Sequence, residues 1–154
     1  MDWLFQNIGV IIQAAAALGA LGTVYFLIRE LSEQNKVSKA NVRQNVADSH
    51  QKMALAGMKK DLVKIKLKLR KDEPLSEEED AMYLSYFAVM LRSRENQYYQ
   101  YSIGMLDESE WSAFVKSFRT LFKSPHHVKL WSFMRETFDD NFVIIVDDLI
   151  KEVS

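Results

Sequence analysis

One uncharged stretch near the start of the chain constrains its fold more than any other feature. Residues 3–28 contain no Asp, Glu, Lys or Arg, and within them residues 8–28 are apolar apart from Gln13 and Thr23. As a helix that rises about 1.5 Å per residue, these residues extend about 39 Å, which exceeds the roughly 30 Å hydrocarbon core of a bilayer. The stretch therefore predicts a transmembrane helix at residues 3–28, with the lipid bilayer as its partner.

Two other interpretations of this stretch fit less well. A cleaved signal peptide has a basic start, a shorter apolar core and small residues after that core. Here only two residues precede the stretch, neither of them basic, and its small residues lie inside it. A buried helix of a soluble domain seldom runs this long without a charge. Aromatic residues at both ends, Trp3 and Phe5 and then Tyr25 and Phe26, are typical of the two membrane interfaces.

Flanking charges predict the orientation of this helix. Arg29, Lys36, Lys39 and Arg43 follow it, whereas no Lys or Arg precedes it. Because cytoplasmic flanks carry the excess of basic residues, we expect the short N-terminus outside and the rest of the chain in the cytoplasm.

Small residues form a ridge along the same helix. Intervals of four residues separate Ala15 from Gly19 and Gly19 from Thr23, a spacing that lets two transmembrane backbones approach closely. The ridge and its polar neighbour predict a homo-oligomer that packs through Gln13, Ala15, Ala16, Gly19, Ala20, Gly22 and Thr23. In the alternatives, Gln13 points toward the headgroups of a solitary helix, or Gln13 and Thr23 line a pore.

The rest of the chain divides by charge and by aromatic content. Residues 29–72 carry 12 Lys or Arg against 5 Asp or Glu, whereas residues 73–154 carry 8 against 15. No aromatic residue lies between Leu27 and Met82, and 14 follow from Tyr83 onward. The pattern predicts three parts: the transmembrane helix at 3–28, a basic helical stalk at 29–72 and an acidic, aromatic-rich helical domain at 73–154. The absence of Cys excludes disulfide scaffolds and cysteine-based metal sites.

The stalk ends in a lysine-rich run. Residues 29–57 are polar with sparse apolar positions, which indicates a solvated helix that pairs weakly, if at all, with a copy of itself. In residues 58–71, apolar and basic residues alternate as in a strand, but Met58, Leu62, Ile65 and Leu69 also share one helical face. A helix is favoured because no partner strand is evident. The basic patch consists of Lys59, Lys60, Lys64, Lys66, Lys68, Arg70 and Lys71.

Binding of anionic lipid or of nucleic acid by this patch is not favoured. A straight helix from Arg29 to Lys59 would hold the patch about 45 Å from the bilayer, far beyond a Debye length of roughly 8 Å. Only a bend, for which Gly57 is a candidate, would return it. Nucleic-acid binding calls for interleaved aromatic residues, which this part of the chain lacks. We expect the patch to neutralise the acidic domain of its own or a neighbouring chain.

Capping signals divide the acidic domain into four amphipathic helices, which predict a small all-α bundle. Capping pairs or Pro mark the helix starts and Gly marks one helix end. These signals are Ser76 with Glu79, Gly104, Asp107 with Glu110, Ser124 with Pro125, and Asp139 or Asp140.

No pattern in the sequence points to catalysis, to a cofactor or to a metal. The serines lie in no nucleophile motif, and the chain has no glycine-rich phosphate loop. His126 and His127 are adjacent, so on a helix they point about 100° apart and are poorly placed to share a metal ion. We therefore predict that the protein is not an enzyme.

Arg94 is the one unusual charge in the domain. It falls on the apolar face of its predicted helix, where a cation needs a partner. We predict a buried ion pair with an Asp or Glu of a neighbouring helix, in preference to a ligand pocket. Four residues nearby could line such a pocket or complete the core: Asn96, Tyr98, Tyr99 and Tyr101.

Three runs in the second half resemble a set of uncharacterised bacterial single-pass membrane proteins, which join an N-terminal transmembrane helix to a small helical domain. The runs are ENQYYQYSIGMLDESEW, SPHHVKLW and FDDNFVIIVDDLIKE, and the resemblance covers about residues 80–150 and the transmembrane helix. It implies a bacterial inner-membrane location and no defined activity. The function expected from the whole sequence is a non-enzymatic interaction or scaffold module that faces the cytoplasm and binds an unidentified protein partner. The alternative is a self-assembling, channel-like effector that perturbs the bilayer.

Overall fold

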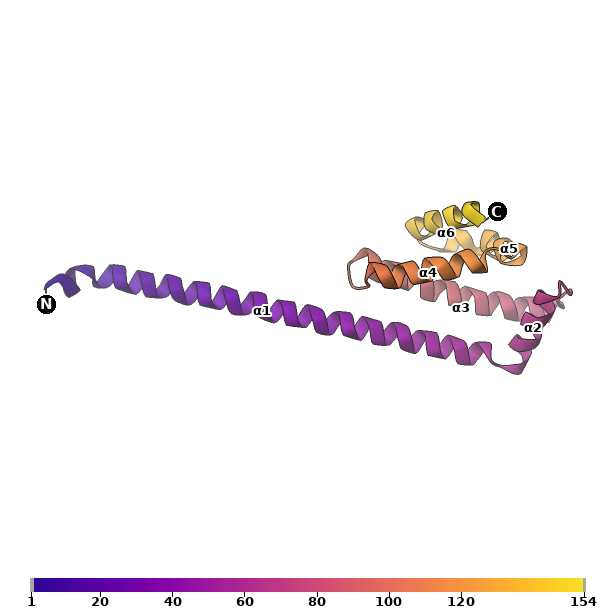
Figure 1. Ribbon diagram of the computed structural model, residues 1–154, viewed down its shortest axis with the longest axis horizontal. Coiled ribbons are helices and arrows are strands. Elements are labelled where there is room, and N and C mark those ends of the chain that lie inside the picture. Colours follow the sequence, from indigo (N-terminus) through magenta and orange to yellow (C-terminus); the bar gives the residue numbers. More distant parts are fainter. Residues whose placement is uncertain (1, 154) are drawn as a thin grey trace. The chain divides into compact units, whose positions relative to one another are not determined.

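The computed structural model of the chain describes the backbone of residues 2–153 and the side chains of residues 6–153. All regular structure in this range is helical (Figure 1), which confirms the all-α fold class. The predicted interfacial residues Trp3 and Phe5 lie outside the described side chains. The helices are α1 (Asp2–Gly57), α2 (Lys60–Arg70), α3 (Glu77–Ser102), α4 (Glu108–Leu121), α5 (Pro125–Met134), the short 3₁₀ helix η1 (Arg135–Thr137) and α6 (Asp140–Val153).

The chain divides into two compact units, residues 1–40 and residues 41–154, and α1 contributes to both. The second unit thus includes residues 41–57, which the sequence assigns to the stalk, as well as α2. Residues 41–57 pack against α3, so this half of the stalk is not a free, solvated helix. The residues that make these contacts are polar. They do not add to a periodic pattern of apolar residues, so the sequence pattern does not reveal the contacts.

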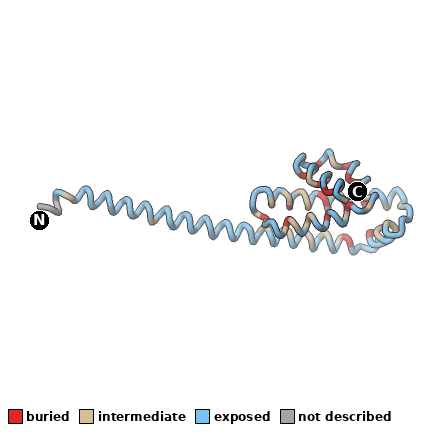
Figure 2. The backbone as a smooth tube through the Cα atoms, turned by 45° about the horizontal axis from the view of Figure 1, so that its top comes forward, coloured by how far each residue is buried: buried red, intermediate tan, exposed pale blue. Residues whose placement is uncertain are grey.

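The first unit is the N-terminal part of α1, and its apolar side chains are exposed. In Figure 2 this part of the tube is coloured almost entirely as exposed. Large apolar residues from Ile8 to Ile28 keep between about half and two thirds of their surface accessible. The helix is long and apolar enough to cross a membrane, judged by its length and composition. The hydroxyl of Thr23 donates to the carbonyl oxygen of Gly19 at 3.0 Å, so it is satisfied within the helix.

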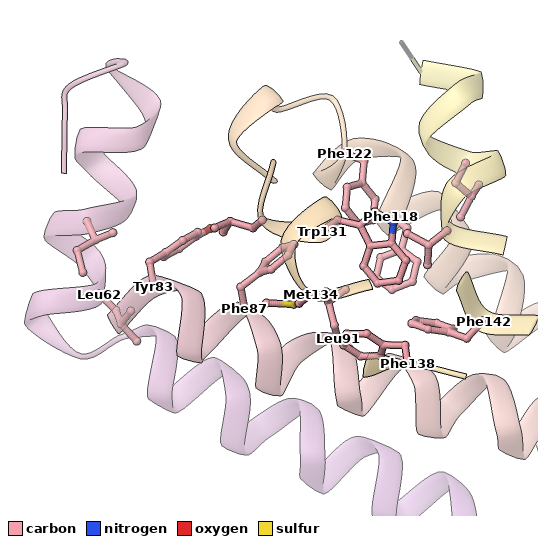
Figure 3. Packing of buried hydrophobic residues seen from close by; sticks show 14 of the residues in the cluster. Leu62, Tyr83, Phe87, Leu91, Phe118, Phe122, Trp131, Met134, Phe138 and Phe142 are labelled. Carbon is pink, nitrogen blue, oxygen red and sulfur yellow. The ribbon is translucent and has the colours of Figure 1, made fainter. Parts of the chain in front are cut away.

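The second unit is built on an aromatic core between α3, α4, α5 and α6. Figure 3 shows Tyr83, Phe87 and Leu91 on α3 pointing toward rings from the later helices. Leu91, Phe142 and Val146 are completely buried. Many of the rings meet edge-on or tilted, at centroid distances typical of aromatic pairs. Examples are Phe87–Phe122, Phe118–Phe142 and Trp131–Phe142. A small domain compensates for its size with such large buried side chains.

Local signals place the helix ends of this unit where the sequence predicts them. Ser76 and Glu79 form the reciprocal capping box that begins α3. The backbone N–H of Asp107 donates to Glu110 at the start of α4, and Pro125 begins α5. Gly104 follows α3 with φ +75°, a conformation that favours glycine.

One helix differs from the sequence pattern, and another confirms an expectation drawn from it. The helix that starts at Pro125 ends at Met134 and tightens into η1, so Phe138 reaches the core from beyond the helix rather than from its face. The lysine-rich run forms α2, a helix rather than a strand, because its Leu62 and Ile65 are buried together on one side against the unit's core.

Candidate functional site

Arg94 lies in a polar cluster between α1 and α3, which we call the Arg94 cluster: His50, Arg94 and Gln97. Arg94 Nη1 donates to Gln97 Oε1 at 2.8 Å and approaches His50 Nε2 at 2.5 Å. The amide nitrogen of Gln97 lies 2.9 Å from the same imidazole nitrogen. The guanidinium also lies over the ring of Phe114 on α4, 4.7 Å from its centroid. Among the described residues Arg94 forms no ion pair, so neutral groups take the place of the acidic partner that the sequence suggests.

The chemistry of the cluster fixes the protonation of His50. Guanidinium and amide NH2 groups only donate, so the Nε2 atom that both approach must be an unprotonated acceptor. Burial lowers the pKa of His50, and the adjacent charge of Arg94 lowers it further. Burial also lowers the pKa of Arg94 from its ordinary 12.5. The cluster is therefore a neutral imidazole held against a permanent cation, which favours neither nucleophilic nor metal chemistry.

The other residues predicted near Arg94 separate in the structure. Asn96, Tyr98 and Tyr99 line a hollow of about 450 Å³ at the N-terminal end of α6. Tyr101 does not reach it, because its ring stacks on Trp111 and its hydroxyl donates to Glu108. The remaining residues around the hollow are Arg92, Glu95, Ser102, Asp139 and Asn141.

Polar and aromatic residues line the hollow, and its charged groups are already bonded. Arg92 pairs with Glu95 and donates to the carbonyl oxygen of Thr137 at 2.6 Å, and its guanidinium lies over the ring of Phe138. Glu95 also accepts the backbone N–H of Asp139 at 2.7 Å. These bonds connect α3 to the segment that begins α6, so the charges serve the packing of the unit.

The basic patch on α2 is partly tied to its own chain. Lys68 forms a 2.7 Å ion pair with Glu79, which lowers the pKa of that carboxyl through a charge-assisted hydrogen bond. Lys66 donates to the carbonyl oxygen of Gly57 at 3.2 Å and lies over the ring of Tyr86. Lys64 and Lys71 lie near acidic residues of their own segment, at 4.0 Å from Asp61 and 3.8 Å from Glu73. Lys59, Lys60 and Arg70 are exposed.

The predicted packing ridge of α1 faces open space. Gln13, Ala15, Ala16, Gly19, Ala20 and Thr23 are exposed, and Gly22 is half-buried. A Cβ atom added at Gly19 or Gly22 would meet no other atom within 4 Å. At these two glycines the ridge is thus open.

Several polar residues that the sequence does not single out hold the second unit together. His127 donates from Nδ1 to the carbonyl oxygen of Leu121 and accepts from the hydroxyl of Tyr83 at 2.7 Å. Asp147 accepts from the indole N–H of Trp131 at 2.8 Å and pairs with Arg135. Each of these side chains bonds with a residue of another helix. Spacing within one helix therefore could not have predicted these bonds.

Chemistry-bearing groups form no metal centre in the part of the chain that the structure describes. No three His, Cys, Asp or Glu side chains there lie close enough together to hold an ion. Comparisons of the chain with protein-family models, with curated proteins and with solved structures found no match.

Proposed function

We propose that this protein is a single-pass membrane protein whose helical unit, residues 41–154, is a non-enzymatic interaction module in the cytoplasm. The observation that carries the proposal is the exposed, uncharged first half of α1. A soluble protein would have to cover such a surface, and none of the apolar window in this helix is buried. A bilayer is the partner whose thickness and chemistry match it.

The compact unit supports a binding role better than a catalytic one. Several of its half-buried polar groups are already engaged in bonds between helices, as His127, Asp147 and Arg94 are. The hollow next to α6 offers exposed aromatic and amide groups, including Tyr99 at 58% exposure, which suit contacts with another protein.

Cysteine labelling tests the anchor and its orientation, because the sequence contains no cysteine. Asp2→Cys and Ser32→Cys place one thiol on each side of the proposed span, residues 3–28. We expect a membrane-impermeant maleimide to label Asp2→Cys on intact bacterial cells and Ser32→Cys only after permeabilisation. The reverse pattern would contradict the orientation. Release of the chain from membranes by alkaline carbonate would contradict the anchor itself.

The proposed homo-oligomer and protein partner require a purification in mild detergent from native membranes. Mass and stoichiometry of the purified complex distinguish the outcomes: a second protein in a fixed ratio supports the interaction module. The replacement pair Gly19→Leu and Gly22→Leu widens the ridge and should dissociate a homo-oligomer that packs through it. Binding of a partner to the helical unit should survive this change.

A second candidate function is a self-assembling membrane effector, and the open ridge on α1 is the observation that favours it. This function predicts a loss of membrane potential on overexpression that disappears in the Gly19→Leu and Gly22→Leu variant. Cells that keep their membrane potential with both chains would exclude it.

A further inference from the structure

Residues 41–57 of α1 are held to α3 and α4 by few contacts, most of them polar. We infer that the Arg94 cluster is a pH switch: protonation of His50 releases residues 41–57 of α1 from α3 and α4. The inference goes beyond the proposed function and does not depend on it. If the first half of α1 is a membrane anchor, release would free the domain from the helix that leads to the membrane.

The geometry of the cluster makes the charged form of His50 incompatible with docking. Protonation at Nε2 would turn an N–H toward two groups that can only donate, Arg94 Nη1 at 2.5 Å and Gln97 Nε2 at 2.9 Å. It would also place a second positive charge directly against the guanidinium. Since Arg94 stays charged at any physiological pH, the repulsion is relieved only if His50 and α1 move away.

The hydrogen bond with Gln97 raises the pKa of His50, but this effect is smaller than those of burial and of the Arg94 charge. The ring of His50 meets the ring of Phe114 edge-on at 5.3 Å, and its neighbour Ser49 bonds with Ser93 at 3.0 Å. The titratable or charged groups on the surrounding elements are Arg43 and Asp48 on α1, Tyr86 and Arg94 on α3, and Glu110 on α4 with Asp107 at its start.

The carboxylates among these groups have other partners. Arg43 holds Glu110 at 2.7 Å and Asp107 at 2.9 Å, and Asp48 accepts from Gln44. Neither Glu110 nor Asp48 bonds with His50 in the described residues. The Arg43 ion pairs also connect α1 to α4, but they do not involve the imidazole, so the switch is assigned to His50 on the geometry of the Arg94 cluster.

The sign of the effect follows from linkage. Burial and the charge of Arg94 lower the pKa of docked His50 below its ordinary 6.5. The docked state is therefore fully favoured above pH 6.5 and loses population as the pH falls below that value. The docking equilibrium should fall by up to about tenfold for each pH unit, until the pKa of the docked state is passed.

Distance measurements between spin labels test the switch on the full chain in nanodiscs. Labels at Gln51→Cys on α1 and Lys116→Cys on α4 occupy exposed positions on the two elements. We expect one narrow distance distribution at pH 8 and a longer, broader one at pH 5. Circular dichroism at each pH verifies that the unit stays folded. An unchanged distribution in the folded protein would overturn the inference.

Two further measurements assign the change to His50. His50→Gln keeps an acceptor but cannot titrate, so its distance distribution should not respond to pH. The matched control His126→Gln, on α5, should keep the response of the parent chain. Retention of the full response in His50→Gln would overturn the inference. Because this variant could fail to dock at all, an NMR titration of the unsubstituted chain decides independently: a His50 pKa of 6.5 or higher refutes the switch.

Discussion

Two adjacent aspartates on α6 show how strongly the role of a charge depends on what it contacts. Asp147 is half-buried, accepts from Trp131 and pairs with Arg135, whose Nε atom is buried without a partner of its own. Asp148 is exposed and pairs with Lys151, one turn along the same helix. Although the two aspartates are neighbours, only Asp148 lies on the solvated face of the helix.

Two single variants, Asp147→Asn and Asp148→Asn, test this difference through the free energy of unfolding. Asp147→Asn removes the charge that compensates Arg135, so we expect a loss of about 1–3 kcal/mol in the free energy of unfolding. Asp148→Asn should change it by less than about 0.5 kcal/mol, as for an exposed pair. Urea unfolding of the detergent-solubilised chain compares the two. Equal effects would show that Asp147 does not hold α5 to α6.

At the scale of helices, the turn between α1 and α2 depends on a close approach at Gly57. A Cβ atom there would lie 2.7 Å from Lys66 Nζ and 2.9 Å from the hydroxyl of Tyr86. The same ammonium group bonds with the carbonyl oxygen of Gly57, the last residue of α1. The bend suggested for Gly57 by the sequence is thus present, and it is stabilised by a residue of the basic patch.

We predict that Gly57→Ala lowers the free energy of unfolding by about 1 kcal/mol, the value of one hydrogen bond. The lysine can swing aside, but only by giving up its bond with the carbonyl oxygen. A double-mutant cycle with Lys66→Met checks this mechanism, because in that background the alanine should cost much less. An undiminished cost would assign the effect to Tyr86 instead.

At the scale of helices, the sequence predicts those features that depend on residues close together in the chain. The starts of α3, α4 and α5 follow from neighbouring residues such as Ser76 with Glu79, and the end of α3 from Gly104. The Arg94 cluster has no local cause: His50 and Arg94 are 44 positions apart, and nothing in either segment indicates the other. The sequence finds the unusual residue, Arg94, without finding its partners.

At the scale of the whole molecule, buried histidines predict sensitivity to acid. Burial lowers the pKa of His127 below its ordinary 6.5, so the folded state favours the neutral ring. Stability is therefore complete above pH 6.5 and declines as the pH falls below it. For His127 the decline is at most about 1.4 kcal/mol for each pH unit, until the pKa of the folded state is passed.

Urea unfolding at pH 7.5, 6.5 and 5.5 measures this dependence before most carboxylates titrate. We expect the midpoint to fall between pH 6.5 and 5.5 and to be nearly constant above. A midpoint that stays level or rises on acidification would contradict the prediction, because it would mean that His127 is charged as readily in the folded state as in the unfolded one.

The exposed first half of α1 has a consequence for rotation about its own axis. A helix that is apolar on every side has almost the same energy whichever side faces a given neighbour. Its apolar length would then set its depth in a bilayer, but not its rotation about its own axis. The ridge through Ala15, Gly19 and Thr23 is the feature that breaks this near-cylindrical symmetry. A second helix could thus pack against this ridge in one preferred orientation. Fluid lipid would impose no such preference and would leave the helix free to rotate about its axis.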